Sequence, residues 1–392
     1  MNQLLSTLKT QFAQIFGNQN PVKFFYAPAR VNLIGEHIDY NGGFVFPAAL
    51  SFKTIIAAAP NGTDVLRVAA TDLPGALVCA PIEKRSVFRG KGFGSYQIGV
   101  ADQLLQAGFN VKGCDMLFWG DIPFGSGLSS SASIEVCTAI CLSDLGGNPP
   151  IDMTRAALLS QAAENKFVGV NCGIMDQFAI ARGKKDNALL LNCDTLEYQY
   201  VPLKLEGAKI VIGNTKKPRS LADSKYNQRR AECDSALELL QAVKPGLKYL
   251  CDLSLDEFLE LGQCITDQII YNRALHAVSE NQRVKDSIAA LKADDIAAFG
   301  QLMIQSHISL RDLYEVTGFE LDTMFDLAVK CDGVIGTRMT GAGFGGCTVS
   351  IVKDAQVDAF IESVGRDYQA ATGFAAEFYV CDIGDGAGVL EE

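Results

Sequence analysis

Apolar positions recur with two different periods along the first half of the chain. Near the N-terminus they follow helical spacing with polar residues between them, at Leu4, Leu5, Leu8, Phe12, Ile15 and Phe16. This spacing predicts an amphipathic helix and not a signal peptide, which has a continuous apolar core. Helical spacing recurs at 95–107, 131–145 and 151–168, whereas shorter β-rich runs predict strands at 23–27, 53–59, 65–70, 115–119, 188–193, 198–203 and 209–213.

The second half of the chain is richer in helical patterns. Helices are predicted at 221–242, 267–291, 294–314 and 321–330. A glycine-rich turn, a strand at 347–353, a helix at 357–369 and a strand at 375–381 follow. The change of pattern near residue 205 predicts two domains, residues 1–205 and 206–392. Because neither half alternates strands and helices regularly, the predicted fold class is α+β and not a doubly wound sheet.

Composition narrows the possible functions. The 392 residues are 48% hydrophobic and 20% charged, as in a globular protein of about two domains. The formal net charge of −11 argues against a broad nucleic-acid surface, although a small anion can still bind locally. No apolar run reaches the roughly 20 residues that a bilayer needs, so we expect a cytoplasmic protein with no membrane contact. The 12 cysteines are scattered and lack a C-x-x-C pair, which favours reduced thiols over a zinc site.

The first segment that carries chemistry spans residues 27–41. It follows a predicted strand and gathers Arg30, Glu36, His37, Asp39 and Asn41 in a turn-rich loop. Carboxylates accept hydrogen bonds from hydroxyls, and imidazole or amide groups donate them. The segment therefore suits a neutral ligand rich in hydroxyl groups, while a solvated loop with an Arg–Glu pair is the alternative.

The second segment, residues 120–133, has the sequence G-D-I-P-F-G-S-G-L-S-S-S-A-S between a predicted strand and a predicted helix. Gly125 and Gly127 let the backbone approach a ligand closely, and the helix N-terminus supplies N–H groups and positive dipole. These features favour a phosphate cradle. Ordinary N-capping by serine is the alternative, but the consecutive residues Ser129, Ser130 and Ser131 exceed what capping needs.

Two further segments indicate a function only when they are considered together with the first two. Residues 339–347, M-T-G-A-G-F-G-G-C, match G-x-G-x-x-G formally, but a strand follows them where a dinucleotide fingerprint needs a helix. A tight hairpin turn explains two of these glycines more easily than four. Residues 171–177, N-C-G-I-M-D-Q, hold Asp176 in uncharged surroundings, with Glu164 12 residues earlier on a predicted helix.

Together these segments resemble the galactokinases of the GHMP small-molecule kinase superfamily. R-V-N-L-I-G-E-H-I-D-Y is similar to the galactokinase signature, G-L-S-S-S-A-S to the phosphate loop and M-T-G-A-G-F-G-G to the third motif. The resemblance covers roughly residues 20–380. It implies two α+β domains, the first like ribosomal protein S5 domain 2 and the second ferredoxin-like. The implied activity is transfer of the γ-phosphate of MgATP to the C1 hydroxyl of D-galactose, the first committed step of galactose catabolism by the Leloir pathway.

The resemblance also implies roles for single residues. Arg30 and Asp176 would form the catalytic pair, and Ser131 and Glu164 would coordinate Mg²⁺. ATP would be a co-substrate, and we expect a monomer. The implied sugar contacts are Glu36, His37, Ile38, Asp39, Gly173 and Tyr226, and the implied ATP contacts are Gly125, Ser126, Gly127, Leu128, Ser129, Ser130 and Ser131.

Three other functions compete with this interpretation. A sister kinase for N-acetylgalactosamine or another sugar would differ in the room around C2, which no motif reveals. A non-catalytic galactose sensor would bind sugar and ATP and act through a partner protein, but the complete 129–133 loop and the filled catalytic positions favour an enzyme. A dinucleotide oxidoreductase would depend on the glycines of residues 341–346 alone.

Overall fold

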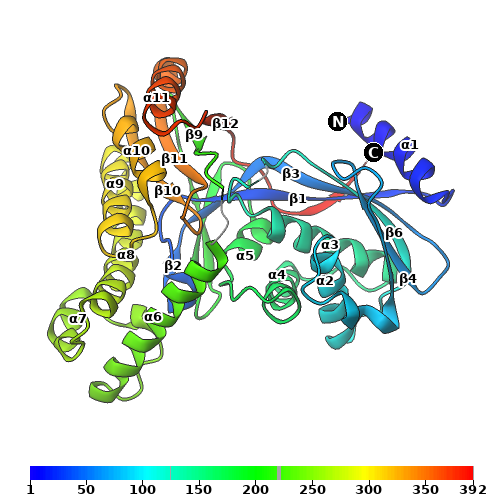
Figure 1. The fold of residues 1–392 in the computed structure, drawn as a ribbon, viewed down its shortest axis with the longest axis horizontal. Helices are drawn as coiled ribbons and strands as arrows, with labels where there is room; N and C mark the ends of the chain where they lie inside the picture. Colours follow the sequence, from blue (N-terminus) through cyan, green and yellow to red (C-terminus); the bar gives the residue numbers. More distant parts are fainter. Residues whose placement is uncertain (124, 219–221, 392) are drawn as a thin grey trace.

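A computed structural model describes residues 1–123, 125–218 and 222–391. Its first half is one large sheet with a helix above it and a group of helices below it, and its second half is a smaller sheet beside long helices (Figure 1). The first half contributes the helices α1 (Asn2–Phe16), α2 (Ser95–Gln106), α3 (Ser130–Gly146), α4 (Met153–Ala163) and α5 (Met175–Arg182). The predicted α+β class is confirmed.

The large sheet has six strands in the order β13-β1-β3-β6-β4-β5. All neighbours are antiparallel except β4 and β6, which run parallel. The strands are β1 (Lys23–Asn32), β3 (Pro47–Pro60), β4 (Val65–Ala70), β5 (Leu77–Pro81), β6 (Cys114–Gly120) and β13 (Gly388–Leu390).

Both faces of the large sheet are covered, and adjacent residues of β1 show how. Phe24 packs among Leu8 and Phe12 of α1, whereas Phe25 belongs to the main core with α3 and α5. Side chains that follow one another in a strand point to opposite faces, so both phenylalanines are buried. This double coverage fixes the path of β1, whose last residues enter the cavity described below.

The second half is built on a four-stranded antiparallel sheet with the order β10-β11-β9-β12. Its strands are β9 (Ala208–Asn214), β10 (Val334–Thr340), β11 (Cys347–Lys353) and β12 (Glu377–Cys381). The helices are α6 (Ala222–Val243), α7 (Leu255–Leu261), α8 (Gln268–Lys292), α9 (Ile296–Asp312), α10 (Phe319–Ala328) and α11 (Val357–Thr372).

A small sheet and several short helical turns complete the fold. The small sheet joins β2 (Phe44–Val45), β7 (Asn187–Asn192) and β8 (Tyr198–Pro202). A π-helical turn, Glu164–Val168, continues α4 and carries one of the predicted site residues. The 3₁₀ turns are Asp39–Asn41, Ile82–Phe88, Leu250–Asp252, Gly262–Cys264 and Asp354–Gln356.

Most elements predicted from the sequence are present, with shifted ends. The predicted helix at 151–168 is α4 followed by the π-helical turn, and the strand predicted at 53–59 starts six residues earlier, at Pro47. Residue 221, where the predicted helix at 221–242 begins, lies outside the described residues. The predictions missed α5 and α7 because they are short, and β10 because it buries the polar Thr337, Arg338 and Thr340.

The division at residue 205 stays a prediction. The sheet of the second half begins at Ala208, close to that division, but β13 pairs with β1 and so adds residues 388–390 to the first sheet. Within the described residues, no helix is long and apolar enough to cross a membrane, and the twelve cysteines form no disulfide.

Candidate active site

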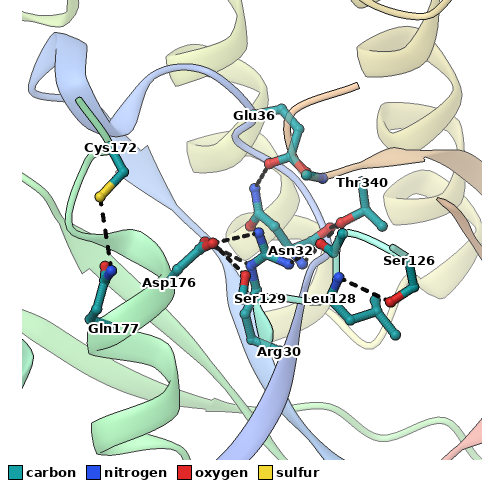
Figure 2. A network of polar contacts seen from close by, with 12 residues as sticks. Arg30, Asn32, Glu36, Ser126, Leu128, Ser129, Cys172, Asp176, Gln177 and Thr340 are labelled. Carbon is teal, nitrogen blue, oxygen red and sulfur yellow. Dashed lines mark hydrogen bonds and ion pairs between the residues drawn. The ribbon is translucent and has the colours of Figure 1, made fainter. Parts of the chain in front are cut away.

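Segments from both halves of the chain surround one cavity of about 300 Å³. They are the end of β1 with the loop after it, the glycine–serine loop before α3, the start of α5, and the loop after β10 (Figure 2). The cavity is lined by Arg30, Glu36, His37, Asp39, Gly125, Gly127, Ser129, Ser130, Ser131, Glu164, Val170, Cys172, Gly173, Met175, Asp176, Tyr226, Gly341 and Ala342.

Arg30 and Asp176 meet in this cavity although 146 positions separate them. Arg30 Nε donates to Asp176 Oδ1 at 2.8 Å and Nη2 donates to Oδ2 at 2.9 Å. The third guanidinium nitrogen, Nη1, donates to the carbonyl of Gly127 at 2.8 Å. The bidentate pair fixes the plane of the carboxylate, and Arg30 is almost fully buried while Asp176 remains partly exposed to the cavity (Figure 2).

The glycine–serine loop faces the same pair. Ser129 begins α3 with a left-handed backbone, φ 62°, and its side chain makes no capping bond to any described residue of that helix. Its hydroxyl instead donates to Asp176 Oδ2. The N–H groups of the first helical turn therefore lack the side-chain cap that the alternative interpretation of this loop requires. They remain a positive end beside Ser130 and Ser131, which line the cavity.

Side chains of three predicted site residues are absent from the cavity lining within the described part of the chain. Ile38 and Leu128 lie in the hydrophobic core. The Ser126 hydroxyl is buried and donates to the carbonyl of Pro123 at 2.7 Å, so it supports the loop from behind. The other predicted site residues all line the cavity.

Asp39 is a buried carboxylate held against the backbone of Gly173. Burial and the negative charge of Asp176 raise the pKa of Asp39 to about 6, while backbone N–H groups of Tyr40 and Met175 act in the opposite direction. A β-carbon at position 173 would lie 1.8 Å from Asp39 Oδ2. Only glycine fits at this position, and no pattern along the chain indicated that Asp39 and Gly173 are in contact.

Glu36 connects the first motif to the third. Its carboxylate accepts hydrogen bonds from Asn32 Nδ2 and from the backbone N–H of Gly341, and it lies 3.7 Å from Arg338 Nη1. Burial raises the pKa of Glu36, and the charges of Arg338 and Arg30 oppose that rise. The glycine-rich segment 339–347 thus closes one wall of the cavity, which its weak G-x-G-x-x-G match could not predict.

His37 lies among aromatic rings at the cavity edge. Its ring centroid is 4.9 Å from that of Tyr314 and 5.5 Å from that of Tyr226. Its Nδ1 lies 2.9 Å from the Tyr40 hydroxyl and its Nε2 lies 3.2 Å from the carbonyl of Ala342. Burial lowers the pKa of His37 to about 3, so the imidazole is neutral at physiological pH.

Glu164, on the π-helical turn, is the second buried carboxylate near Asp176. It takes part in a hydrogen bond with the Ser131 side chain, and Gln177 Nε2 donates to its Oε2 at 2.7 Å. Gln177 also donates to Glu135 Oε2 at 3.0 Å. Burial and the charge of Asp176 raise the pKa of Glu164 to about 7. An additional positive charge beside this oxygen cluster would favour its ionised form.

The pair of oxygen donors fits Mg²⁺. Ser131 and Glu164 contact each other at the cavity wall, next to the free helix end where phosphate would lie. Mg²⁺ prefers oxygen ligands, retains water and is usually held by one or two carboxylates together with substrate phosphates. The described residues contain no group of three or more Asp, Glu, His or Cys side chains that could hold a metal ion.

Comparisons with known proteins agree with this geometry. Residues 10–60 match the galactokinase galactose-binding signature, residues 95–184 the N-terminal domain of GHMP kinases and residues 287–370 their C-terminal domain. The chain is 48% identical to the galactokinase of Fusobacterium nucleatum, covering 99% of this chain and 100% of that one. It is 50% identical to the galactokinase of Clostridium acetobutylicum, with 98% of each chain covered.

Solved structures confirm the expected GHMP kinase fold. The crystal structure of Lactococcus lactis galactokinase complexed with galactose matches with a TM-score of 0.96 and 41% identity, covering 99% of this chain and 100% of that one. Mevalonate kinase of Methanococcus jannaschii, at 18% identity and a TM-score of 0.67, shares the fold. The chain therefore belongs to the galactokinases, a family of ATP-dependent sugar kinases within the GHMP superfamily.

Proposed function

We propose that the cavity transfers the γ-phosphate of MgATP to the C1 hydroxyl of D-galactose, giving galactose 1-phosphate. The observation that carries this proposal is the Arg30–Asp176 pair, which faces a cavity shared by a hydroxyl-binding loop and an uncapped helix N-terminus. A sugar hydroxyl and a terminal phosphate could meet only where these two surfaces adjoin. Positioning of that kind supplies most of the rate enhancement in phosphoryl transfer.

In this proposal Asp176 accepts the proton of the C1 hydroxyl. The loose transition state of phosphoryl transfer asks little of a base until late, so a carboxylate of ordinary strength suffices. Arg30 holds Asp176 in one plane and offsets the charge that develops on the migrating phosphoryl group. Ser129 orients the same carboxylate through its hydroxyl.

The phosphates of ATP would lie against the loop 125–131 and the start of α3. Gly125 and Gly127 have φ values of 68° and 76°, a left-handed conformation that glycine adopts without strain, and their lack of side chains leaves room for the phosphates. The backbone N–H groups of the first turn would bind phosphate oxygens. Ser131 and Glu164 would hold Mg²⁺, which neutralises phosphate charge when bound.

The sugar would lie against the first motif. Asp39 and Glu36 offer carboxylate oxygens to sugar hydroxyls, His37 and Tyr226 offer polar aromatic edges, and the backbone at Gly173 closes the remaining side. Support comes from the L. lactis structure, which contains galactose in a chain of the same fold. We also propose that the protein works as a monomer in the cytoplasm, where MgATP is supplied.

The decisive experiment is ADP release from MgATP with galactose, glucose and N-acetylgalactosamine in parallel. We expect turnover with galactose at least tenfold above that with either other sugar. Turnover highest with N-acetylgalactosamine would favour the sister kinase. Galactose binding by calorimetry without any turnover would favour the sensor. Light scattering of the same sample gives the oligomeric state.

A further inference from the structure

A series of hydrogen-bonded side chains, Tyr40, Tyr314 and Cys233, lies behind His37, and we call it the hydroxyl chain. The Tyr40 hydroxyl lies 2.9 Å from His37 Nδ1 and 2.8 Å from the Tyr314 hydroxyl. The Tyr314 hydroxyl lies 3.0 Å from the sulfur of Cys233. Tyr314 and Cys233 are fully buried and come from the second half of the chain, between α9 and α10 and from α6. The motif analysis singled out none of these three partners.

One backbone carbonyl determines which group is the donor in each of these hydrogen bonds. The carbonyl of Ala342 can only accept, so His37 Nε2 must carry a hydrogen to bond to it at 3.2 Å. Because the ring is neutral, Nδ1 is then bare and accepts from Tyr40. The Tyr40 hydroxyl donates its only hydrogen to Nδ1, so its oxygen accepts the hydrogen of the Tyr314 hydroxyl.

The last link follows in the same way. Tyr314 donates its hydrogen to Tyr40, so its own oxygen can only accept, and the thiol of Cys233 donates to it. The opposite tautomer of His37 would place a lone pair of Nε2 against the lone pairs of the Ala342 carbonyl and so lose that bond, whereas Tyr40 could still pair with Nδ1 by accepting from it. Burial makes such unpaired groups costly, so the arrangement is strongly selected.

We propose that Tyr40 and Tyr314 are positioning residues that hold the His37 ring, in the tautomer that the Ala342 carbonyl selects, with its Nε2–H directed at the cavity edge. His37 and Ala342 both line the cavity, so a sugar hydroxyl can take the Nε2 hydrogen in place of the longer bond to the carbonyl. This inference rests on the proposed function, because it assigns His37 to the sugar.

The hydroxyl chain also helps to hold the backbone conformation of His37. His37 has φ 62°, a left-handed conformation that costs a non-glycine residue energy and persists only when its surroundings hold it. The bonds of the ring to Tyr40 and Ala342, with the tilted Tyr314 ring beside it, hold the side chain in this conformation. Loss of the Tyr314 hydroxyl would therefore loosen a donor at the sugar site, although Tyr314 lies in the second half of the chain.

The tautomer can be observed directly because the chain has only three histidines, His37, His276 and His307. Imidazole ¹⁵N spectra of histidine-labelled protein would contain three ring systems, and the His37→Gln protein would identify the one that belongs to His37. We expect a protonated Nε2 and a bare Nδ1 for His37 from pH 5 to pH 8. In Tyr40→Phe the Nδ1 resonance should shift towards that of a nitrogen with no hydrogen-bond donor. A protonated Nδ1 in the unmodified protein would overturn the proposal.

Galactose affinity gives the functional readout. Tyr314→Phe removes one oxygen and keeps the buried ring, and we expect the galactose Kd to rise about five- to tenfold with the ATP Kd unchanged. The matched control is Tyr368→Phe, another fully buried tyrosine, whose hydroxyl donates to the carbonyl of Thr215 at 2.9 Å. The control should lose comparable stability while keeping galactose affinity.

The remaining outcomes separate this inference from the proposed function. If Tyr314→Phe does not fold, the half-buried Tyr40→Phe replaces it in the same calorimetry with the same expected rise. A galactose Kd within twofold of the unmodified protein in the folded variant would overturn the positioning role. If the unmodified protein binds no galactose, the proposed function fails, while the ¹⁵N spectra still report the tautomer of His37 and its hydrogen bond to Tyr40.

Discussion

The two aspartates of the cavity differ in their neighbours, although both are carboxylates within one site. Asp176 is paired with Arg30 through two hydrogen bonds. Asp39 is buried against Gly173, and burial together with the charge of Asp176 raises the pKa of Asp39 to about 6. The first is therefore held in place by a cation, whereas the pKa of the second places its titration near physiological pH.

This difference predicts a pH dependence of sugar binding. Below pH 6 Asp39 gains a proton and loses its capacity as a double acceptor, so the galactose Kd should rise as pH falls. A site with a pKa of about 6 gives a rise of about tenfold between pH 7 and pH 5. Calorimetry without Mg²⁺ and ATP isolates this effect from Glu164. Asp39→Asn should flatten the profile, and a flat profile in the unmodified protein would contradict the assignment.

The substitution Asp176→Asn tests whether Asp176 accepts the proton of the C1 hydroxyl. The amide keeps the shape of the side chain but cannot accept the C1 proton and no longer neutralises Arg30. We expect kcat to fall about 10²- to 10⁴-fold while galactose still binds. Rapid-quench assays measure the first quantity and calorimetry the second. A kcat within tenfold of the unmodified enzyme would remove Asp176 from the chemistry.

Gly173→Ala tests the packing beneath Asp39. The new methyl group would lie 1.8 Å from Asp39 Oδ2, so the carboxylate must move away from the sugar. The KM for galactose should rise about tenfold or more, with the KM for ATP unchanged. Gly120→Ala is the control, because the nearest atom to its methyl group would be 3.6 Å away. Equal effects of both substitutions would argue against a specific contact.

At the scale of single residues, the motifs predicted which side chains line the cavity but not how they hold one another. Arg30 and Glu36 stood out as members of a polar, turn-rich loop, and Asp176 as a charge in uncharged surroundings. Tyr40 closes the first motif, but nothing in the sequence indicated its contact with Tyr314, which spans 274 positions. Partners so distant in sequence become visible only when the chain is folded.

At the scale of elements, the second half depends on a close crossing of α9 and β10. Gly300 of α9 and Gly336 of β10 face each other, and a β-carbon on Gly300 would lie 2.0 Å from the carbonyl of Ile335. Larger residues would separate the helix from the strand. Because β10 leads directly into the 341–346 loop, this crossing also sets the position of one cavity wall.

Gly300→Ala should therefore destabilise the protein. Replacing a helical glycine by alanine normally stabilises a helix by about 1 kcal/mol, but the clash with backbone outweighs that gain. We expect an apparent melting temperature several degrees lower. Gly365→Ala in α11 is the matched control, because its methyl group would meet only the edge of the Phe378 ring at 3.2 Å. Differential scanning calorimetry of both variants measures the contrast, and a stabilised Gly300→Ala protein would contradict it.

Helices and strands were predicted best where the apolar residues recur with a clear period and the buried residues are apolar. The amphipathic α1 and the apolar α3 matched closely, since their patterns do not depend on distant partners. In contrast, β10 buries Arg338 and two threonines, and the short strand β13 at the edge of the large sheet pairs with β1, which is far away in sequence. Polar residues that are satisfied by tertiary contacts defeat a rule that equates strand interiors with apolar runs.

At the scale of the whole molecule, the site is a junction between the two halves of the chain. The first motif lies at the end of β1, the phosphate loop precedes α3, and the third motif follows β10. Each wall of the cavity is therefore attached to its own helix or strand. The bonds from Asn32 and Glu36 to Thr340 and Gly341 join the walls directly (Figure 2). Rotation of one half against the other would break these bonds.

The pairing of β13 with β1 has a consequence for biosynthesis. Phe24, Phe25 and Tyr26 acquire their outer neighbours only when residues 388–390 have left the ribosome, long after β1 itself has been translated. Until then the strand that carries Arg30 has an open edge, which can pair with another nascent polypeptide. A fragment ending near residue 205 would keep that edge exposed permanently, so expression as two separate halves should yield aggregation instead of two soluble pieces.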